Sequence, residues 1–541
     1  MRKLLVGIII LLLLIPSVVS VSINYTTLSK IGNTLYVGGS GPGNYSKIQD
    51  AIDDSSNGHT IFVFDDSSPY YENILVDKRI NLIGEDKNKT IIDGSGKDDV
   101  VYISVNAVTI SGFTIQNSGD DWDDDAGIDI HSVGNTIKGN NIRNNSHGIL
   151  CKSISFNTFI ANIIKNNERG ISLYRVNNNL IFENTFISNR DEHLSLTHSN
   201  LNIIKNNKFR SGSKFGIRLS VSNNNNVTDN SFYHCGAEFF ISTFSNISNN
   251  TVNGKPLIYM VGESNKTIRE AGQIYLKDCI NITIQNLDIS NVSFSIHGEN
   301  FSNCLIADNY FDNTLYPIYL LGLKLSSNIT IINNIFYKSD YGILLEKVKD
   351  CIIKDNYFYN TDCKVSSNTD CRVSQRSTNI SIINNTFIKG HWNVYLDRTT
   401  YSNISNNIIS LGEYGIYLWQ SSEYNFISRN IINDNNVGIK IGSSLKNNNI
   451  SNNEISNNKF GVELGSKSSG NIIFHNNFIE NSIHAFFFNC KDNLWQCNYW
   501  DNWIGARIKL PIFQRLPKMI FGFIGINFDW NPASEPYDIG V

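Results

Sequence analysis

A short apolar pattern of the form Gly-Ile-X-Leu recurs along most of the chain. Clear copies start at Gly127, Gly148, Gly170, Gly216, Gly342, Gly415, Gly438 and Gly461. Degenerate copies occur around Leu194, Ile296, Ile318 and Val394. Neighbouring clear copies lie 21, 22, 23 and 23 residues apart, in the runs 127, 148, 170 and 415, 438, 461. A fixed period of this length is the sequence signature of a solenoid.

A second pattern, Asn-X-Ile followed by Asn-Asn-X-Ile or Phe, runs between the copies, for example over 425–432. Each period therefore contains about three short alternating strands separated by Asn, Ser and Gly corners. Alternation turns the Ile, Leu and Phe side chains inward, and stacking of coils about 4.8 Å apart buries them. Asn tolerates the left-handed backbone of tight corners, and stacked Asn side chains can form hydrogen-bonded ladders. The chain is thus predicted to be an all-β, single-chain parallel β-helix.

Both ends of the repeat array differ from its middle. Residues 46–52 predict a short amphipathic helix with a capping box of Ser46 and Gln49, just before a strand over 60–64. We expect this helix to cover the N-terminal end of the solenoid, because an open end exposes unpaired strand edges. After 498–501 (Asn-Tyr-Trp-Asp) the repeat is lost, and the aromatic, proline-containing remainder is expected to fold over the last coil as a C-terminal cap.

The N-terminus has the pattern of an export signal. Arg2 and Lys3 precede an apolar run over 4–15, and small residues allow cleavage after Ser20. The run is short for a membrane span of about 20 residues, and an uncleaved anchor is the alternative. A second apolar stretch, 519–526, is too short to span a bilayer and holds two glycines. The protein is therefore expected to be secreted and to contact a membrane only through a retained signal.

These boundaries divide the chain into four parts. They are a signal peptide (1–20), N-terminal cap and entry coils (21–125), β-helix repeats (126–497) and a C-terminal cap or tail (498–541). An irregular insertion is expected at about 361–378, inside the repeats.

Composition limits the partners. The net charge of -4 and the lack of a basic patch argue against nucleic acid. Asn-X-Ser/Thr acceptors are frequent and support a glycoprotein if the host glycosylates: Asn24, Asn44, Asn88, Asn144, Asn226, Asn246, Asn281, Asn291, Asn328, Asn379, Asn403 and Asn449.

Several segments resemble known families. The stretches 35–39, 48–52, 82–85 and 91–94 resemble the entry coils of pectin-lyase-like proteins. The repeats, the segment 252–257 and the terminal 498–501 resemble NosD-type β-helix proteins, most closely the secreted NosD-like surface proteins of archaea. This resemblance implies a right-handed parallel β-helix with repeats often described as carbohydrate-binding or sugar-hydrolase repeats. NosD itself is implicated in maturing the copper site of nitrous oxide reductase, but fold does not carry that activity over.

The residues argue against copper. Copper(I) sites favour clustered Met, Cys and His. The chain has three Met, at positions 1, 260 and 519, and its His residues are scattered.

One dense acidic segment is a candidate metal site. A hard cation such as Ca²⁺ takes six to eight oxygen ligands, and a loop of this kind could supply several. Asp129 and His131 lie two residues apart on a strand and hence on one face. The segment could serve a lyase or epimerase with a His or Tyr base, or it could be a solvated loop. Its candidate ligands are Asp120, Asp121, Asp123, Asp124, Asp125, Asp129 and His131.

A set of aromatic residues is a candidate glycan-binding surface. In three coils the outward position of the repeated strand is Tyr319, Tyr395 or Tyr417. Sugar rings stack on flat aromatic faces, whereas ordinary cross-strand packing is the alternative explanation. The full set is Tyr316, Tyr319, Tyr341, Trp392, Tyr395, Tyr414, Tyr417 and Trp419.

The cysteines divide into two kinds. Cys279, Cys304 and Cys351 occupy apolar repeat positions and are expected in the core. The pairs Cys363–Cys371 and Cys490–Cys497 are predicted disulfides of an oxidising compartment.

The preferred hypothesis is a non-catalytic cell-surface protein that binds polysaccharide or neighbouring surface proteins along a rigid solenoid. The first alternative is a polysaccharide lyase, hydrolase or epimerase with its site at the acidic segment. The second alternative is a NosD-like factor for copper-site maturation. Calcium is the only cofactor for which the sequence offers candidate ligands.

Overall fold

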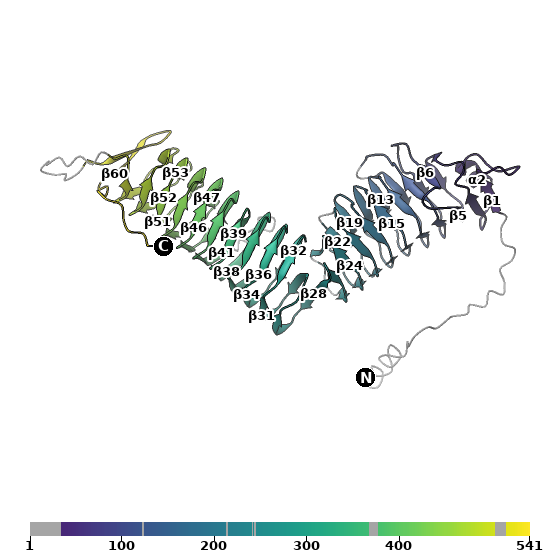
Figure 1. Cartoon of the computed structure of the whole chain (residues 1–541), viewed down its shortest axis with the longest axis horizontal. Helices are drawn as coiled ribbons and strands as arrows, with labels where there is room; N and C mark the ends of the chain where they lie inside the picture. The colour runs from purple at the N-terminus through teal and green to yellow at the C-terminus, as the bar shows by residue number, and fades with distance from the viewer. Residues whose placement is uncertain are drawn as a thin grey trace, which may run out of the picture.

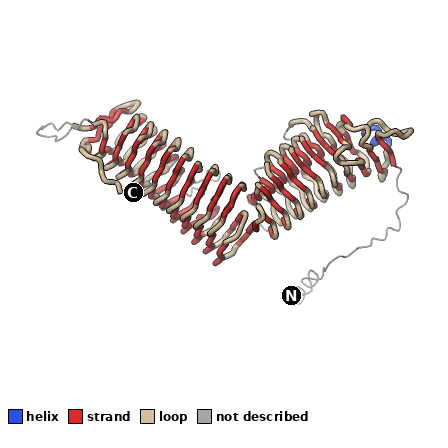
Figure 2. The backbone as a smooth tube through the Cα atoms, viewed as in Figure 1, coloured by secondary structure: helices blue, strands red, loops and turns tan. Residues whose placement is uncertain are grey.

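The protein is a long parallel β-solenoid of about 19 coils with only 1% helix, so the predicted fold class is confirmed (Figures 1 and 2). The computed structural model describes residues 34–121, 124–212, 215–240, 242, 245–366, 377–503 and 516–540. The predicted signal peptide lies outside the described residues. Up to about residue 252 each coil adds one strand to each of three sheets, and the later coils add their strands to two sheets. Almost every strand pairs in parallel with its equivalent in the next coil.

A coil from the first half shows how the sequence pattern produces the solenoid. Its strands are β14 (Thr158–Ile160), β15 (Ile163–Lys165) and β16 (Arg169–Tyr174). They pair in parallel with β17 (Leu180–Phe182), β18 (Thr185–Ile187) and β19 (Glu192–Thr197) of the next coil. The alternating side chains Phe159, Ile164 and Leu173 point inward and are buried. Strand β19 is the degenerate repeat expected around Leu194, so that copy is confirmed.

Buried asparagines form ladders along the corners, as the sequence predicted. Asn184 donates through its side-chain nitrogen to Asn207 Oδ1 at 3.1 Å, and Asn207 donates to Asn230 Oδ1 at 3.0 Å. The same nitrogen of Asn207 also donates to the carbonyl of Ile181 at 2.8 Å. Each ladder side chain therefore satisfies backbone and amide groups that the corner buries away from water.

The corners also explain why asparagine and aspartate are so frequent just before the ladders. A left-handed residue comes directly before each of the three ladder asparagines. The φ angles are 56° at Glu183, 55° at Asn206 and 58° at Asp229. Asn and Asp adopt this left-handed conformation more readily than most residues.

The solenoid consists of two straight limbs that meet at an angle, which we call the elbow (Figure 1). The first limb ends with β25 (Gly236–Phe240) and β27 (Thr251–Val252). The chain then turns back, so that β28 (Lys255–Val261) is antiparallel to β27 before it starts the second limb by pairing with β30 (Gln273–Lys277).

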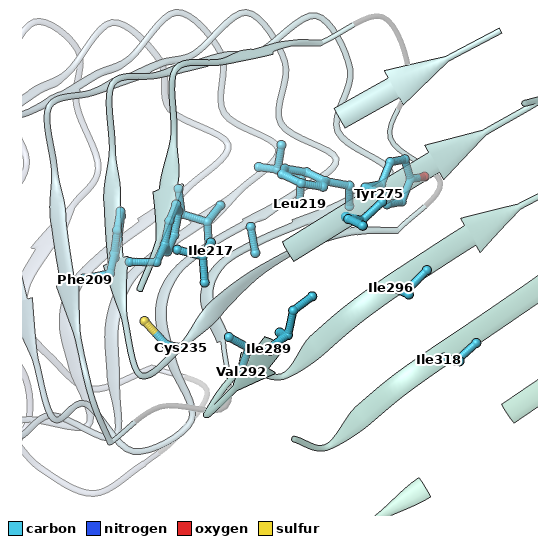
Figure 3. Close-up of a cluster of buried hydrophobic side chains, with 14 of the residues drawn as sticks. Phe209, Ile217, Leu219, Cys235, Tyr275, Ile289, Val292, Ile296 and Ile318 are labelled. Carbon is cyan, nitrogen blue, oxygen red and sulfur yellow. The ribbon is translucent and has the colours of Figure 1, made fainter. Parts of the chain in front are cut away.

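Side chains of the second limb cover the open end of the first. Tyr275, on the outward side of β30, lies beside Leu219 in the core of the first limb (Figure 3) and packs edge-on against Phe239 with ring centroids 5.5 Å apart. The side chain of Gln273 donates to the carbonyl of Ala237 at 2.6 Å and accepts from its amide at 2.9 Å. Apolar burial and paired hydrogen bonds therefore join the limbs.

The predicted N-terminal helix is present as α2 (Ile48–Asp54). Its apolar residues Ile48, Ala51 and Ile52 are buried. They face the strands β1 (Thr34–Val37), β2 (Thr60–Val63) and β4 (Ile74–Val76).

The predicted capping box is wrong. The helix starts after Lys47, which makes no side-chain cap. The amides of Ile48 and Gln49 instead donate to the carboxylate of Glu72, at 2.8 and 2.9 Å. That carboxylate also complements the positive end of the helix dipole.

The described part of the predicted insertion is regular. Strand β40 (Asp362–Ser366) pairs with β38 (Tyr341–Lys354) on one side and with β43 (Trp392–Asp397) on the other. Strand β41 (Ser377–Ile383) pairs in parallel with the later part of β38. The flanks of the segment therefore belong to the solenoid, and residues 367–376 lie outside the described residues.

The Asn ladder should be a main source of stability. Asn207→Ala would remove the side-chain partner of the carbonyl of Ile181 and of the backbone amide of Asn184 in the core, so the free energy of unfolding should fall by about 2–4 kcal/mol. Urea unfolding followed by circular dichroism measures this change. The matched control is Asn246→Ala, which removes two exposed side-chain bonds of 3.0 and 3.3 Å and should change stability by less than about 0.5 kcal/mol. Equal losses in the two variants would contradict the role of the ladder.

Candidate functional site

The candidate residues lie mainly on one side of the solenoid, formed by the outward side chains of the strands that carry the Gly-Ile-X-Leu repeat. We call this surface the repeat-strand face. In the first limb it includes β7 (Val101–Ile103), β10 (Ala126–Ile130), β13 (His147–Lys152) and β22 (Phe215–Ser220). In the second limb it includes β33 (Phe294–Glu299), β36 (Tyr316–Ile332) and β47 (Tyr414–Trp419), together with β38, β40 and β43.

The register places three of the predicted aromatic residues in one outward row, but the row is interrupted. Tyr319 lies opposite Leu344, and Lys364 lies opposite both Leu344 and Tyr395. Tyr395 then lies opposite Tyr417. The predicted stripe is therefore two separate clusters rather than one continuous surface.

The first cluster lies at the elbow. Tyr316 stacks on Tyr341 with centroids 5.3 Å apart and on Phe294 at 4.9 Å. Phe294 also stacks on Phe215 of the first limb at 5.9 Å. Tyr319 completes the group, 5.8 Å from Tyr316. These contacts show that cross-strand packing accounts for part of the pattern seen in the sequence.

The second cluster lies about three coils further along. Trp392 stacks on Tyr395 with centroids 5.2 Å apart, and Tyr414 stacks on Tyr417 at 5.0 Å. Trp419 lies 5.6 Å from Tyr417. Burial raises the pKa of Tyr417 to about 12 and also raises that of Tyr395, so both phenols stay neutral donors at ordinary pH.

The ring geometry determines what these clusters can bind. In the first cluster rings stack from coil to coil, whereas in the second they stack within a strand and Tyr395 meets Tyr417 edge-on across the coils. Stacked rings cover much of each other's faces, so a ligand meets ring edges, hydroxyl groups and the uncovered ring faces. All members except Phe294 and Tyr395, which are 3% and 9% exposed, are partly exposed. Such a surface combines apolar area with hydrogen-bonding groups.

A hydrogen bond and an ion pair within the protein hold the acidic segment in place. Asp125 accepts from the amide of Asp121 at 2.9 Å, and Asp124 pairs with Lys152 at 3.0 Å. That lysine lowers the pKa of Asp124. Asp120 is exposed, and Asp123 lies outside the described residues. In the described part of the chain, no three His, Cys, Asp or Glu side chains are grouped to hold a metal ion. The calcium site stays a prediction.

Asp129 and His131 do come together, as their spacing predicted. His131 Nε2 lies 2.6 Å from Asp129 Oδ2, and Tyr102 stacks on the imidazole at 4.7 Å. Asp129 is 4% exposed, and its other oxygen, Oδ1, has no hydrogen-bond partner. Burial raises the pKa of this carboxyl, whereas the bond to His131 opposes the rise.

The sequence did not reveal Asp99, which lies one coil earlier beside Asp129. Burial, followed by the charge of Asp129, raises the pKa of Asp99 to about 7. Its Oδ1 accepts from the amide of Ala126 at 2.7 Å. The residue precedes a strand without the Gly-Ile signature, so no local pattern marked it.

A cavity of about 330 Å³ lies next to this acidic pair on the same face. Its lining includes the basic side chains His147, Lys152 and Arg169. The hydroxyl groups of Ser172, Tyr174, Ser195 and Thr197 also belong to the lining residues. Cationic groups and hydroxyls therefore lie beside two carboxyls on this part of the first limb.

The sequence pattern also did not indicate a cluster of charged side chains at the elbow. Arg218 pairs with Glu192 at 2.7 Å and with Glu238 at 2.8 Å, and its guanidinium lies 5.4 Å from the centre of the Phe215 ring. Burial raises the pKa of Glu238 although Arg218 opposes the change. These three charges come from consecutive coils, so only the register brings them together.

The cysteine predictions need one correction. Cys490 and Cys497 are both free, so the disulfide predicted between them is wrong. Cys490 is buried, and its thiol donates to the carbonyl of Gly465 at 2.9 Å inside the solenoid. Cys371 and the side chain of Cys363 lie outside the described residues, so that disulfide remains a prediction. Cys279, Cys304 and Cys351 are buried in the core, as expected.

Comparison with protein families gives one match. The family model described as periplasmic copper-binding protein (NosD) matches residues 81–255, 245–373 and 361–505. A search of the curated proteins gives no match.

Three solved structures represent the structural comparison. ORF18 of Geobacillus virus E2 has 16% identity and a TM-score of 0.33, and the match covers 46% of this chain and 54% of that one. A double mutant of the periplasmic alginate epimerase AlgG has 15% identity and a TM-score of 0.29, and the match covers 59% of this chain and 76% of that one. The GH87 alpha-1,3-glucanase catalytic domain in complex with nigerose has 13% identity and a TM-score of 0.30, and the match covers 69% of this chain and 66% of that one. The chain spans about half the length of ORF18, and similarities at this level carry no argument about function.

The Asp99 carboxyl should make stability depend on pH. Its pKa is raised to about 7 from an ordinary 3.8, so its favourable contribution is complete below about pH 4 and is lost as the pH rises through 7. Asp99→Asn keeps an acceptor for Ala126 but cannot ionise. The urea midpoint of this variant should therefore fall less than that of the unaltered protein between about pH 5 and pH 8. Some pH dependence should remain, because burial also raises the pKa of Asp362 to about 7. Identical pH profiles for the two proteins would contradict the assignment.

Proposed function

The chain belongs to the NosD family, and from the chemistry of its repeat-strand face we propose that it is an extracytoplasmic protein that binds a polysaccharide along that face. The observation that carries the proposal is the cluster of Trp392, Tyr395, Tyr414, Tyr417 and Trp419. These residues occupy two paired strands, and all of them except the buried Tyr395 have partly exposed rings.

Polysaccharides suit such a surface for two reasons. Sugar rings have apolar faces and polar edges, and half-exposed tyrosine and tryptophan side chains have the same combination. In the second cluster two neighbouring coils, about 4.8 Å apart, present the same kind of binding group, as a linear glycan repeats its sugars. The elbow cluster adds a second aromatic group beside Arg218, whose donors could bind sugar hydroxyls.

The family description raises copper as an alternative ligand. Copper(I) sites favour several Met, Cys or His side chains in one place. Among the described residues Met260 and Met519 lie in different parts of the solenoid, on β28 and near the C-terminus, and no three His, Cys, Asp or Glu side chains are grouped for a metal. The described residues do not fit a copper site, and we derive no step through copper.

The location outside the cytoplasm is part of the proposal. It is supported by the export pattern over 1–20 and by the periplasmic description of the family. Among the helices in the described ranges, none has the length and apolar character needed to cross a membrane.

Affinity electrophoresis tests the binding surface. In gels that contain dextran, alginate or chitosan, the protein should be retarded by at least one of the polymers. A triple variant, Tyr395→Ala, Tyr417→Ala and Trp419→Ala, should lose that retardation because the cluster no longer has its rings. The matched control is Tyr310→Ala with Tyr357→Ala, two tyrosines that are each 38% exposed on a different sheet. Full retardation of a folded triple variant would contradict the proposal.

A second candidate function, an enzyme acting on the bound polysaccharide, is favoured by one observation. The Asp129–His131 pair has a buried oxygen without a partner and lies beside the basic cavity of the first limb. Such a pair can move a proton to or from a substrate bound in the cavity, whose cations could hold an acidic sugar. The test for this function is separate from the binding test.

Product analysis decides this second candidate. The unaltered protein, incubated with the same polysaccharides, should release unsaturated or reducing ends. Asp129→Asn and His131→Gln should each slow that release at least about 100-fold, since general acid–base catalysis typically contributes this much. The exposed His198→Gln is the control and should have no effect. Failure of the unaltered protein to release ends from any polymer would exclude a lyase or hydrolase acting on these polymers and leave the binding proposal intact.

A further inference from the structure

A small cavity, which we call the elbow pocket, lies where the two limbs meet. Its volume is about 330 Å³, and its walls come from both limbs. The first limb contributes corner residues that precede β22 and β25, and the second limb contributes those that precede β33 and β36. The buried side chains Cys235 and Val292, one from each limb, lie beside each other at this junction (Figure 3). Neither limb forms the pocket alone.

Hydrogen bonds between the limbs fix the shape of the pocket. The side chain of Asn253 accepts from the backbone amide of His234 at 2.9 Å and donates to the carbonyl of Ser290 at 2.8 Å, so that one residue joins the two walls. The paired bonds between Gln273 and Ala237 join the limbs a few residues further along the chain. A site held in this way is organised before a ligand arrives, which lowers the entropy cost of binding.

One buried hydroxyl group in the pocket has no hydrogen-bond partner. Ser293 is 4% exposed, and its Oγ makes no hydrogen bond with any described residue. Native proteins rarely keep such a group unless water or a ligand completes its bonding, because burial without a partner costs free energy. Since Ser293 belongs to the lining of the pocket, a ligand there would supply the missing bond.

Two asparagines of the lining add further groups that a ligand can use. The side-chain nitrogen of Asn313 donates to Asn291 Oδ1 at 2.7 Å, which orients both amides. The side-chain nitrogen of Asn291 and the side-chain oxygen of Asn313 make no hydrogen bond within the described ranges. The pocket therefore offers donors as well as acceptors.

The chemistry of the lining selects an uncharged sugar. Among the described residues that line the pocket there is no Asp, Glu, Lys or Arg, whereas Cys235, Val292 and Leu315 supply apolar atoms. A sugar unit has hydroxyl groups that each donate and accept, beside C–H groups that suit apolar contact. The volume is at the lower end of the range of small-molecule sites, about 300–1,000 Å³, so it fits one sugar unit rather than a long segment of polymer.

We propose that the elbow pocket binds one uncharged sugar unit, either free or at the end of a chain. Ser293 and Leu315 come directly before Phe294 and Tyr316 of the elbow cluster, so a chain that lies on this cluster can place its end in the pocket. For a chain end the inference rests on the proposed function, whereas for a free sugar it does not. The residues of the pocket lie outside both aromatic clusters, so the two proposals can fail separately.

Saturation-transfer NMR with the full chain tests the pocket. The ligands are glucose, galactose, mannose and N-acetylglucosamine, with glucuronic acid as the charged comparison. The protein is produced in a host that adds no N-glycan, because Asn291 is itself an acceptor site. At least one neutral sugar should bind, and Ser293→Ala should weaken that binding about three- to tenfold, the effect of one hydrogen bond.

Stability and a matched variant separate binding from a structural role. The urea midpoint of Ser293→Ala should not fall, because the hydroxyl has no partner in the free protein. The control is Ser295→Ala, which removes another buried hydroxyl without a partner among the described residues, outside the lining of the pocket. This control should bind the sugar as the unaltered protein does.

A second pair of variants locates the sugar at the asparagines. Asn291→Gly with Asn313→Gly should weaken binding at least about tenfold, since several hydrogen bonds are lost. Glycine tolerates the φ angles of 55° and 50° at these positions. The control, Asn303→Gly with Asn328→Gly, removes an equivalent exposed pair joined at 2.8 Å and should have no effect.

A trisaccharide of the bound sugar distinguishes the two sources. Tighter binding of the trisaccharide than of the single sugar, weakened by Ser293→Ala, would identify a chain end, whereas equal binding of the two would identify a free sugar. The triple variant of the second cluster should keep the small sugar although it loses the polymer. Absence of binding by every neutral sugar, equal binding by Ser293→Ala and the unaltered protein, or tighter binding of glucuronic acid would overturn the inference.

Discussion

The buried asparagine ladders are the interaction on which the rest of the structure depends. A coil of about 22 residues turns sharply at each corner, and the turns leave backbone carbonyls and amides inside the solenoid. The side chain of Asn207 bonds to the carbonyl of one coil and to the asparagines of the coils on both sides. Each ladder position can therefore be filled only by a side chain that both donates and accepts.

Because the ladders and the inward Ile, Leu and Phe residues determine the fold, the outward positions are free to differ. A single outward row holds Tyr319, Leu344, Lys364 and Tyr395 in sequence, one per coil. Aromatic clusters, ionisable pairs and cavities can occur on this scaffold without any change in the repeat. The elbow adds a corner where the charged pair of Arg218 and Glu238 meets aromatic residues of the second limb.

The period of the sequence was sufficient to predict the fold and the pairing of Tyr395 with Tyr417, because register follows directly from repeat spacing. The elbow was not predictable, since the chain between Gly254 and Gly272 lacks the repeat and its path depends on how Tyr275 and Gln273 pack on the first limb. The capping of α2 by Glu72 and the position of Asp99 were missed for a related reason. Both depend on residues about one coil apart that no local pattern connects. The Cys490–Cys497 prediction failed because closeness in sequence does not mean that two thiols face each other.

Hydroxyl-radical footprinting in the presence of a polysaccharide tests the central claim most directly. This method measures the oxidation of individual tyrosine and tryptophan side chains in the unaltered protein. A polymer that retards the protein should reduce the oxidation of Trp392, Tyr414, Tyr417 and Trp419, and should leave that of Tyr310 and Tyr357 unchanged. Protection confined to other surfaces, or equal oxidation with and without the polymer, would contradict the assignment of the repeat-strand face as the binding surface.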